Sequence, residues 1–159
     1  MKQKGKREMR NFRLTDESGH QEAIFEWRAY QVGKYPELAL LHHVPNGGKR
    51  DKTTATTLKR QGVRAGVPDL VLPVARCGYH GLYIELKAPG GALEQAQIDF
   101  LQAVEQEDYL ALVCVGWRAA AQVLTAYMEQ QEPQTEPLTT KATPKEGAYR
   151  YVGKGVQHG

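Results

Sequence analysis

The chain has 159 residues, of which 41% are hydrophobic and 25% charged, and its formal net charge is +3. These values suit one soluble globular domain with residues left over for tails. They exclude a helical membrane protein, because no apolar run approaches the roughly 18 residues that a span needs. The basic N-terminus has no apolar segment behind it, which argues against a secretory signal. Cys77 and Cys114 stand at no metal-ligand spacing, so we expect a reduced, cytoplasmic setting.

Positive charge is concentrated in two segments. Residues 1–14 contain six basic residues and one acidic residue, and residues 42–64 contain the same numbers. Together these segments carry +10, so the rest of the chain carries −7. Such segregation favours an extended polyanion as partner, although a solvated tail and a charged loop would give the same pattern. Residues 1–13 are expected to form a basic flexible arm.

The first predicted helix begins between residues 15 and 18 and ends near residue 31. Ser18 and Gln21 have the spacing of a capping box, and apolar residues follow at helical intervals. Glu17 lies at the head of this helix, on the continuation of its inward face. The alternative is that a carboxylate in that place has no role beyond its favourable interaction with the positive end of the helix dipole.

The next segment combines a short apolar run, a glycine turn and a second helix. Residues 38–44 favour a strand, and residues 45–50, Pro-Asn-Gly-Gly-Lys-Arg, are typical of a turn. Its glycines would let backbone N–H groups approach a phosphate, and its basic residues add charge, but an ordinary turn fits nearly as well. Residues 53–61 predict a helix that is capped by one of its first threonines and ended by Gly62.

Two strands joined by a glycine-containing loop form the centre of the predicted fold. Residues 70–74 are an apolar run, and residues 82–87 alternate, with Glu85 and Lys87 on one face. If the two strands pair antiparallel, Asp69 falls opposite Glu85 or Lys87. Two carboxylates that close repel each other, and a divalent cation between them is the simplest compensation. The alternative is a solvated strand face with one ion pair, which contributes little stability.

An amphipathic helix and a third strand follow this hairpin. Residues 93–107 predict the helix, and Gln97 lies on its apolar stripe, where a polar amide needs either a partner or a wet edge. Residues 109–115 are nearly all apolar, which predicts a central strand connected to the second hairpin strand by a βαβ crossover. A last helix is expected over residues 118–130, and residues 132–145 have the composition of a linker.

The pattern Pro68-Asp69, fifteen intervening residues and then Glu85-Leu86-Lys87 resembles the PD-(D/E)xK nuclease superfamily. More narrowly, the chain resembles the virus-type replication-repair nuclease family, VRR-NUC. The supporting motifs, in chain order, are Glu17-Ser-Gly-His-Gln21, Pro45-Asn-Gly47, Gly62-Val63, Gly66-Val-Pro-Asp69, Tyr83-Ile-Glu-Leu-Lys87 and Gln97. A bare Pro-Asp…Glu-x-Lys pattern also occurs by chance, whereas all of these elements in this order are specific.

The resemblance implies an α/β fold with a restriction-endonuclease-like PD-(D/E)xK core, in which helices flank a mixed central sheet. It assigns residues 14–131 to the nuclease domain, after the basic arm of residues 1–13. Residues 132–159 then remain as a mostly flexible C-terminal tail, in which residues 149–152 favour a small strand.

The resemblance also implies a metal-dependent active site on the hairpin. Asp69 and Glu85 would bind Mg²⁺ or Mn²⁺ through carboxylate oxygens, with the backbone carbonyl of Leu86 as a third ligand. Magnesium keeps several waters, so one of them can attack the phosphate while the metal acts as a Lewis acid. Lys87, on the same strand face as Glu85, would orient that water and stabilise the developing negative charge.

Two further residues carry over to this site from other elements. Glu17 matches the first-helix carboxylate of the family and would contact the metal directly or through water. Glu22 and Glu26, which form a separate and outward-facing row, are the other candidates for that acid. Gln97 matches the helix glutamine that supports the site.

The implied activity is a metal-dependent DNA endonuclease that hydrolyses phosphodiester bonds. It would be of a phage or prophage type, acting in a bacterial host cell, with branched or junction DNA as a candidate substrate. Nucleases of this compact kind often form homo-oligomers, so a dimer or higher assembly is expected by analogy. DNA contacts are expected from these residues: Asn46, Lys49, Arg50, Lys52, Lys59, Arg60 and Arg64. The alternative from another class is a non-catalytic nucleic-acid-binding or packaging accessory protein, which would be expected to lack Lys87 or one of the acids.

Overall fold

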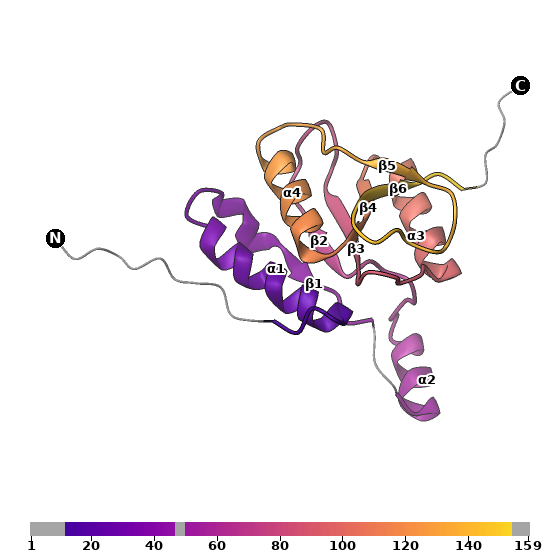
Figure 1. Cartoon of the computed structure of the whole chain (residues 1–159). Coiled ribbons are helices and arrows are strands. Elements are labelled where there is room, and N and C mark those ends of the chain that lie inside the picture. The colour runs from indigo at the N-terminus through magenta and orange to yellow at the C-terminus, as the bar shows by residue number, and fades with distance from the viewer. Residues whose placement is uncertain (1–11, 47–49, 154–159) are drawn as a thin grey trace, which may run out of the picture.

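In the computed structural model, which describes residues 12–46 and 50–153, a six-stranded sheet runs in the order β1-β2-β3-β4-β6-β5 (Figure 1). The strands are β1 His42–His43, β2 Leu70–Leu72, β3 Leu82–Lys87, β4 Leu110–Val115, β5 Glu136–Leu138 and β6 Gly147–Tyr151. The helices are α1 Glu17–Gln31, the 3-10 helix η1 Pro36–Leu40, α2 Lys52–Arg60, α3 Gln95–Gln106 and α4 Trp117–Met128. Most of the expected basic arm, residues 1–11, lies outside the described residues, as does Lys49.

The central hairpin has one of the two predicted registers. β2 and β3 are antiparallel, with Leu70 opposite Ile84 and Leu72 opposite Leu82. Continued by one pair, this register sets Asp69 opposite Glu85. β3 then runs parallel to β4, while β4 pairs antiparallel with β6. The sheet is therefore mixed, as the sequence predicts.

Helices cover both faces of the sheet because β3 alternates between two apolar clusters. Its even-numbered residues pack with α1 and α4, through side chains such as Ile24 and Leu124. Its odd-numbered residue Tyr83 packs toward α3, against a cluster that contains Ile98 and Leu101. Figure 1 shows the resulting layers, with α1 and α4 on one side of the sheet and α3 on the other. No helix in the described ranges is both long and apolar enough to cross a membrane.

Several element boundaries differ from the sequence prediction. Asp16 caps α1, accepting a 2.9 Å hydrogen bond from the N–H of Gly19, so the capping box expected at Ser18 is not formed. Asp51 caps α2, two residues before the first of the expected threonines. Within the strand expected over residues 38–44, only His42–His43 form a strand, β1, while residues 38–40 belong to the 3-10 helix η1. Leu38 and Leu41 are both buried three residues apart, a spacing that suits three residues per turn.

The segment expected to be a mostly flexible tail contributes two strands to the sheet. β6 pairs with β4, with Tyr149 opposite Val113, and β5 pairs parallel with β6. Leu138 is buried, and Tyr149 and Tyr151 pack against the cluster under α3. The linker-like composition of residues 132–145 hides β5, whereas β6 overlaps the small strand expected over residues 149–152. Both strands are short and are stabilised by the neighbouring strand rather than by their own propensity.

Replacing Gly19 with alanine should destabilise the protein, although alanine is normally the better helix former by about 1 kcal/mol. A Cβ at Gly19 would lie 1.6 Å from the carbonyl oxygen of Arg13, so the chain before α1 would have to move. We expect the free energy of unfolding to fall by about 2 kcal/mol, measured by urea denaturation. Gly33→Ala is the matched control, since no atom lies within 4 Å of a Cβ placed there. Equal stability of both variants would contradict this close approach.

Candidate active site

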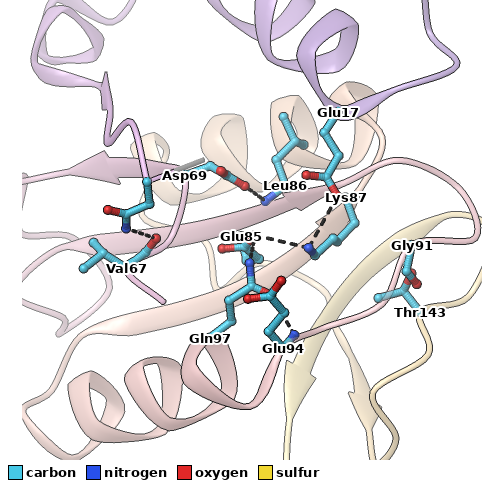
Figure 2. Close-up of polar contacts among 11 residues, drawn as sticks. Glu17, Val67, Asp69, Glu85, Leu86, Lys87, Gly91, Glu94, Gln97 and Thr143 are labelled. Atoms are coloured by element: carbon cyan, nitrogen blue, oxygen red, sulfur yellow. Dashed lines mark hydrogen bonds and ion pairs between the residues drawn. The ribbon is translucent and has the colours of Figure 1, made fainter. Parts of the chain in front are cut away.

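Asp69 is held at the start of β2 by contacts to its backbone and side chain. Its carbonyl oxygen accepts a 2.9 Å hydrogen bond from the N–H of Val44, and Nδ1 of His43 also lies 2.9 Å from it. Its side-chain Oδ2 accepts a 2.9 Å hydrogen bond from the N–H of Leu86 on β3. The carboxylate therefore reaches across the hairpin to the backbone of β3, as Figure 2 shows.

Glu85 is a buried carboxyl group with one oxygen lacking a hydrogen-bond partner. It is 1% exposed, and its Oε1 accepts a 2.8 Å hydrogen bond from Nε2 of Gln97. Its Oε2 is buried without a hydrogen-bond partner. Burial, followed by repulsion from Asp69, raises the pKa of Glu85 from 4.5 to about 9. The protein thus keeps an acid where its negative charge is poorly stabilised by the surrounding groups.

This arrangement fits a divalent metal ion. An unpaired buried oxygen beside a second carboxylate is a position that a cation would stabilise, and Mg²⁺ is commonly bound by one or two carboxylates together with waters. Within the described residues no group of three or more His, Cys, Asp and Glu side chains forms a ready-made metal cage. The fit therefore rests on Asp69 and Glu85, with remaining positions open to backbone oxygen, water or phosphate.

The backbone carbonyl of Leu86 is suited to complete this ligand set. The odd-numbered residues of β3 turn their carbonyls toward β4, as the 2.8 Å bond from the N–H of Gly116 to Lys87 shows. Leu86 therefore faces β2, where the observed register sets it opposite Pro68. Proline has no N–H, so it cannot donate a ladder hydrogen bond to the Leu86 carbonyl. That oxygen lies on the same edge as Asp69.

Lys87 connects the hairpin to the head of α1. The residue is 5% exposed. Its ammonium lies 3.6 Å from Oε1 of Glu85 and 3.4 Å from Oε1 of Glu17 (Figure 2). Glu17 is thus the first-helix acid that forms an ion pair with Lys87. Glu17 and Asp69 also line one cleft of about 500 Å³, together with Glu22 and His43.

Gln97 is held at both ends of its amide. Its Oε1 accepts a 2.9 Å hydrogen bond from the N–H of Glu94, which forms the capping box of α3, and its Nε2 donates to Glu85. This explains a polar residue on the apolar stripe of the helix, since the first turn of α3 faces the acidic site. The amide fixes the side chain of Glu85 and leaves Oε2 for another partner.

The residues predicted to contact DNA are spread over several places. Asn46 donates a 2.9 Å hydrogen bond to the carbonyl of Val67, just before Pro68 and Asp69. Arg50 donates to the carbonyl of Pro45 at 3.2 Å. The remaining described residues of this set are exposed, namely Lys52, Lys59, Arg60 and Arg64. Helix α2, which carries three of these four, has no buried residue and stands apart from the body of the protein (Figure 1).

His20 is a supporting residue to which the sequence assigned no role. It is 6% exposed, its Nδ1 accepts a 3.1 Å hydrogen bond from the N–H of Trp117, and its Nε2 lies 3.2 Å from the carbonyl of Leu14. It therefore joins the head of α1 to the start of α4 and holds the turn that carries Glu17. Its position four residues before the buried Ile24 is the signal that could have identified it as inward-facing.

A larger hollow lies away from this site. It measures about 830 Å³ and lies between α4 and the last strands, with Gln122, Glu132 and Ala148 among its lining residues. It contains none of the residues that surround Glu85. The chemistry of the carboxylates and the lysine, rather than the size of a cavity, therefore marks the candidate active site.

Comparison with known proteins identifies the family. The VRR-NUC domain model matches residues 15–117. A solved structure described as a VRR_NUC domain protein is 32% identical and superposes with a TM-score of 0.63, over 73% of this chain and 90% of that one. No curated protein matches the chain. Because the model covers well over half of the chain and includes Glu17, Asp69, Glu85, Lys87 and Gln97, the chain belongs to the VRR-NUC family, which implies a nuclease of the PD-(D/E)xK type.

Proposed function

We propose that this protein is a Mg²⁺- or Mn²⁺-dependent endonuclease that hydrolyses phosphodiester bonds in DNA, with branched or junction DNA as its substrate. The observation that carries the proposal is the buried Oε2 of Glu85, which has no hydrogen-bond partner. The same carboxyl group is repelled by Asp69, and its Oε1 lies 3.6 Å from the ammonium of Lys87. A buried carboxylate oxygen with no partner costs free energy unless a cation or proton compensates it. A metal-binding role accounts for that cost.

The metal would be held by Asp69, Glu85 and the Leu86 carbonyl, and would supply Lewis-acid activation of phosphate and water. Gln97 orients Glu85 through the 2.8 Å hydrogen bond to Oε1. Lys87 offers its ammonium to the attacking water and to charge that develops on the phosphate. Glu17, 3.4 Å from that ammonium, positions it and would contact the metal directly or through water.

The proposed DNA-binding surface consists of Asn46, Lys49, Arg50, Lys52, Lys59, Arg60 and Arg64. Asn46 shapes the chain beside Asp69, while the exposed cations would contact backbone phosphates. We further propose a nuclease domain over residues 14–131, whose sheet β5 and β6 extend. We also propose a homo-oligomer that brings two sites to two strands, and a phage or prophage origin with action in the cytoplasm of the host.

A cleavage panel tests this function. Purified protein is incubated with linear duplex, single-stranded, flap and four-way-junction DNA, with Mg²⁺, Mn²⁺ or EDTA, and the products are resolved on denaturing gels. We expect cuts with either metal and none in EDTA, with branched substrates cut fastest. Absence of cleavage on every DNA form with both metals would contradict the nuclease proposal and favour a protein that only binds nucleic acid.

A further inference from the structure

Four aromatic side chains from separate parts of the chain meet on the α3 side of the sheet. Tyr83 of β3 contacts Phe100 of α3 and Tyr109 before β4 edge-on, with ring centroids 5.6 and 5.4 Å apart. The ring centroid of His80, in the loop between β2 and β3, lies 5.8 Å from that of Tyr109. We call these four residues the aromatic platform. Three of its rings are only half-buried and His80 is exposed, so the platform reaches solvent.

The aromatic platform adjoins the candidate active site at one end. Tyr83 and Glu85 point to the same face of β3, two residues apart, which corresponds to about 6.6 Å along the strand. Tyr83 also packs against the apolar cluster under α3, so its ring is already held in place. A rigid ring beside a catalytic carboxylate can bind a neighbouring group with little loss of side-chain entropy.

A basic segment adjoins the aromatic platform at Phe100. The guanidinium carbon of Arg64 lies 5.3 Å from the centroid of the Phe100 ring, a cation–π contact. The same loop passes so close to α3 that a Cβ on Gly66 would lie 2.2 Å from the Ala96 carbonyl oxygen. Arg64 lies four residues after the end of α2, whose exposed cations are part of the proposed DNA-binding surface. The candidate metal site and the basic segment thus both adjoin the aromatic platform.

We propose that the aromatic platform stacks against unpaired bases next to the phosphodiester bond that is cut, so that the preferred substrate is DNA with single-stranded character at the cut site. This inference rests on the proposed nuclease function and names its substrate class. Bases of any sequence stack on aromatic rings and on arginine planes, whereas paired bases inside a duplex cannot reach them. The half-buried rings give such bases an apolar surface, and Arg64 offers positive charge to the adjoining phosphates.

The test compares binding of a twelve-nucleotide oligo-dT with binding of a duplex of equal length, by fluorescence anisotropy in EDTA with the full chain. Phe100→Leu removes the π-face but keeps an apolar side chain, and Phe100→Trp restores it. Tyr30→Leu is the matched control, because Tyr30 is an exposed aromatic residue of α1 outside the platform. Thermal melting followed by circular dichroism confirms that each variant is folded.

We expect Phe100→Leu to lower the affinity for oligo-dT about 10-fold while the duplex affinity stays within about twofold, since stacking contributes only when bases are unpaired. The salt dependence of binding should stay unchanged, because no phosphate contact is removed. Phe100→Trp should recover the affinity, and its tryptophan emission should be quenched by oligo-dT more than that of the wild type. Tyr30→Leu should behave as wild type.

Unchanged oligo-dT affinity in Phe100→Leu, or an equal loss for oligo-dT and duplex, would overturn the inference. A change of oligomeric state on gel filtration with light scattering, without a change in DNA binding, would also overturn it and assign the platform to a second copy of the chain.

The nuclease proposal is judged separately. If the wild type cleaves DNA while Phe100→Leu cleaves flap and duplex substrates as the wild type does, the platform fails and the nuclease stands. If selective loss of oligo-dT binding occurs in a protein that cleaves nothing, base stacking on the platform stands and the nuclease fails.

Discussion

Replacing Lys87 with alanine should lower the rate of metal-dependent DNA cleavage by about 10²- to 10³-fold, the loss seen when one preorganised charge-stabilising donor is removed from an active site. The ammonium is nearly buried and lies between the carboxylates of Glu85 and Glu17, so no solvent-exposed cation can replace it. The measurement is single-turnover cleavage of the best substrate from the panel, with Mg²⁺ and with Mn²⁺.

Two comparisons make the Lys87 result specific. Lys145→Ala removes an exposed lysine and the same formal charge, and should leave the rate unchanged. DNA binding by Lys87→Ala in EDTA should stay close to that of the wild type, because the role proposed for this lysine is at the cut phosphate rather than along the DNA surface. An unaltered cleavage rate in highly purified Lys87→Ala would rule out the proposed role of this residue.

In EDTA, the free energy of unfolding should fall as the pH rises from about 5 toward 9, because of Glu85. The pKa of this carboxyl is raised from 4.5 to about 9 in the folded protein, so the folded state binds a proton that the unfolded state has released. The stabilisation is complete below the unfolded pKa and is lost as the pH approaches the folded pKa. One such group contributes a slope of at most about 1.4 kcal/mol per pH unit. Urea unfolding followed by tryptophan fluorescence measures it.

The variant Glu85→Gln isolates this group. A neutral amide in place of the carboxyl removes the slope, so the stability of the variant relative to the wild type should rise with pH in EDTA. Saturating Mn²⁺ at pH 8 should stabilise the wild type and not the variant, because ligand binding to the folded state alone raises the free energy of unfolding. Glu107→Gln, at an exposed position, serves as control. Parallel pH profiles of wild type and Glu85→Gln would contradict the assignment.

Local sequence patterns predicted the elements whose signal lies within a few residues. The alternation over residues 82–87 gave the bounds of β3, and the apolar run of residues 109–115 gave the central strand β4 almost to the residue. The helix caps were harder to predict, because several Ser, Thr and Asp residues near the start of each helix are suitable cap residues. Asp16 and Asp51 took those positions in the structure. Strand β5 was missed, and β6 was predicted only in part, as the small strand over residues 149–152, since its pairing partner β4 is distant in the chain.

By itself the sequence predicted which charged residues gather on the hairpin. Strand alternation places Glu85 and Lys87 on one face, and antiparallel pairing brings Asp69 across from this pair, opposite Glu85 in the observed register. The apolar stripe around Gln97 likewise showed that a polar amide would need a partner. These conclusions concern neighbours along or across one hairpin and one helix, where geometry is nearly invariant.

Only the tertiary structure decided which of these charged groups contact one another. It set Glu17 against Lys87, seventy residues further along the chain, and left Oε2 of Glu85 buried without a partner. It also gathered the rings of the aromatic platform beside that carboxylate and left α2 without a buried residue. Burial and contacts between distant elements depend on how whole helices and strands pack, and no local period in the sequence encodes that packing.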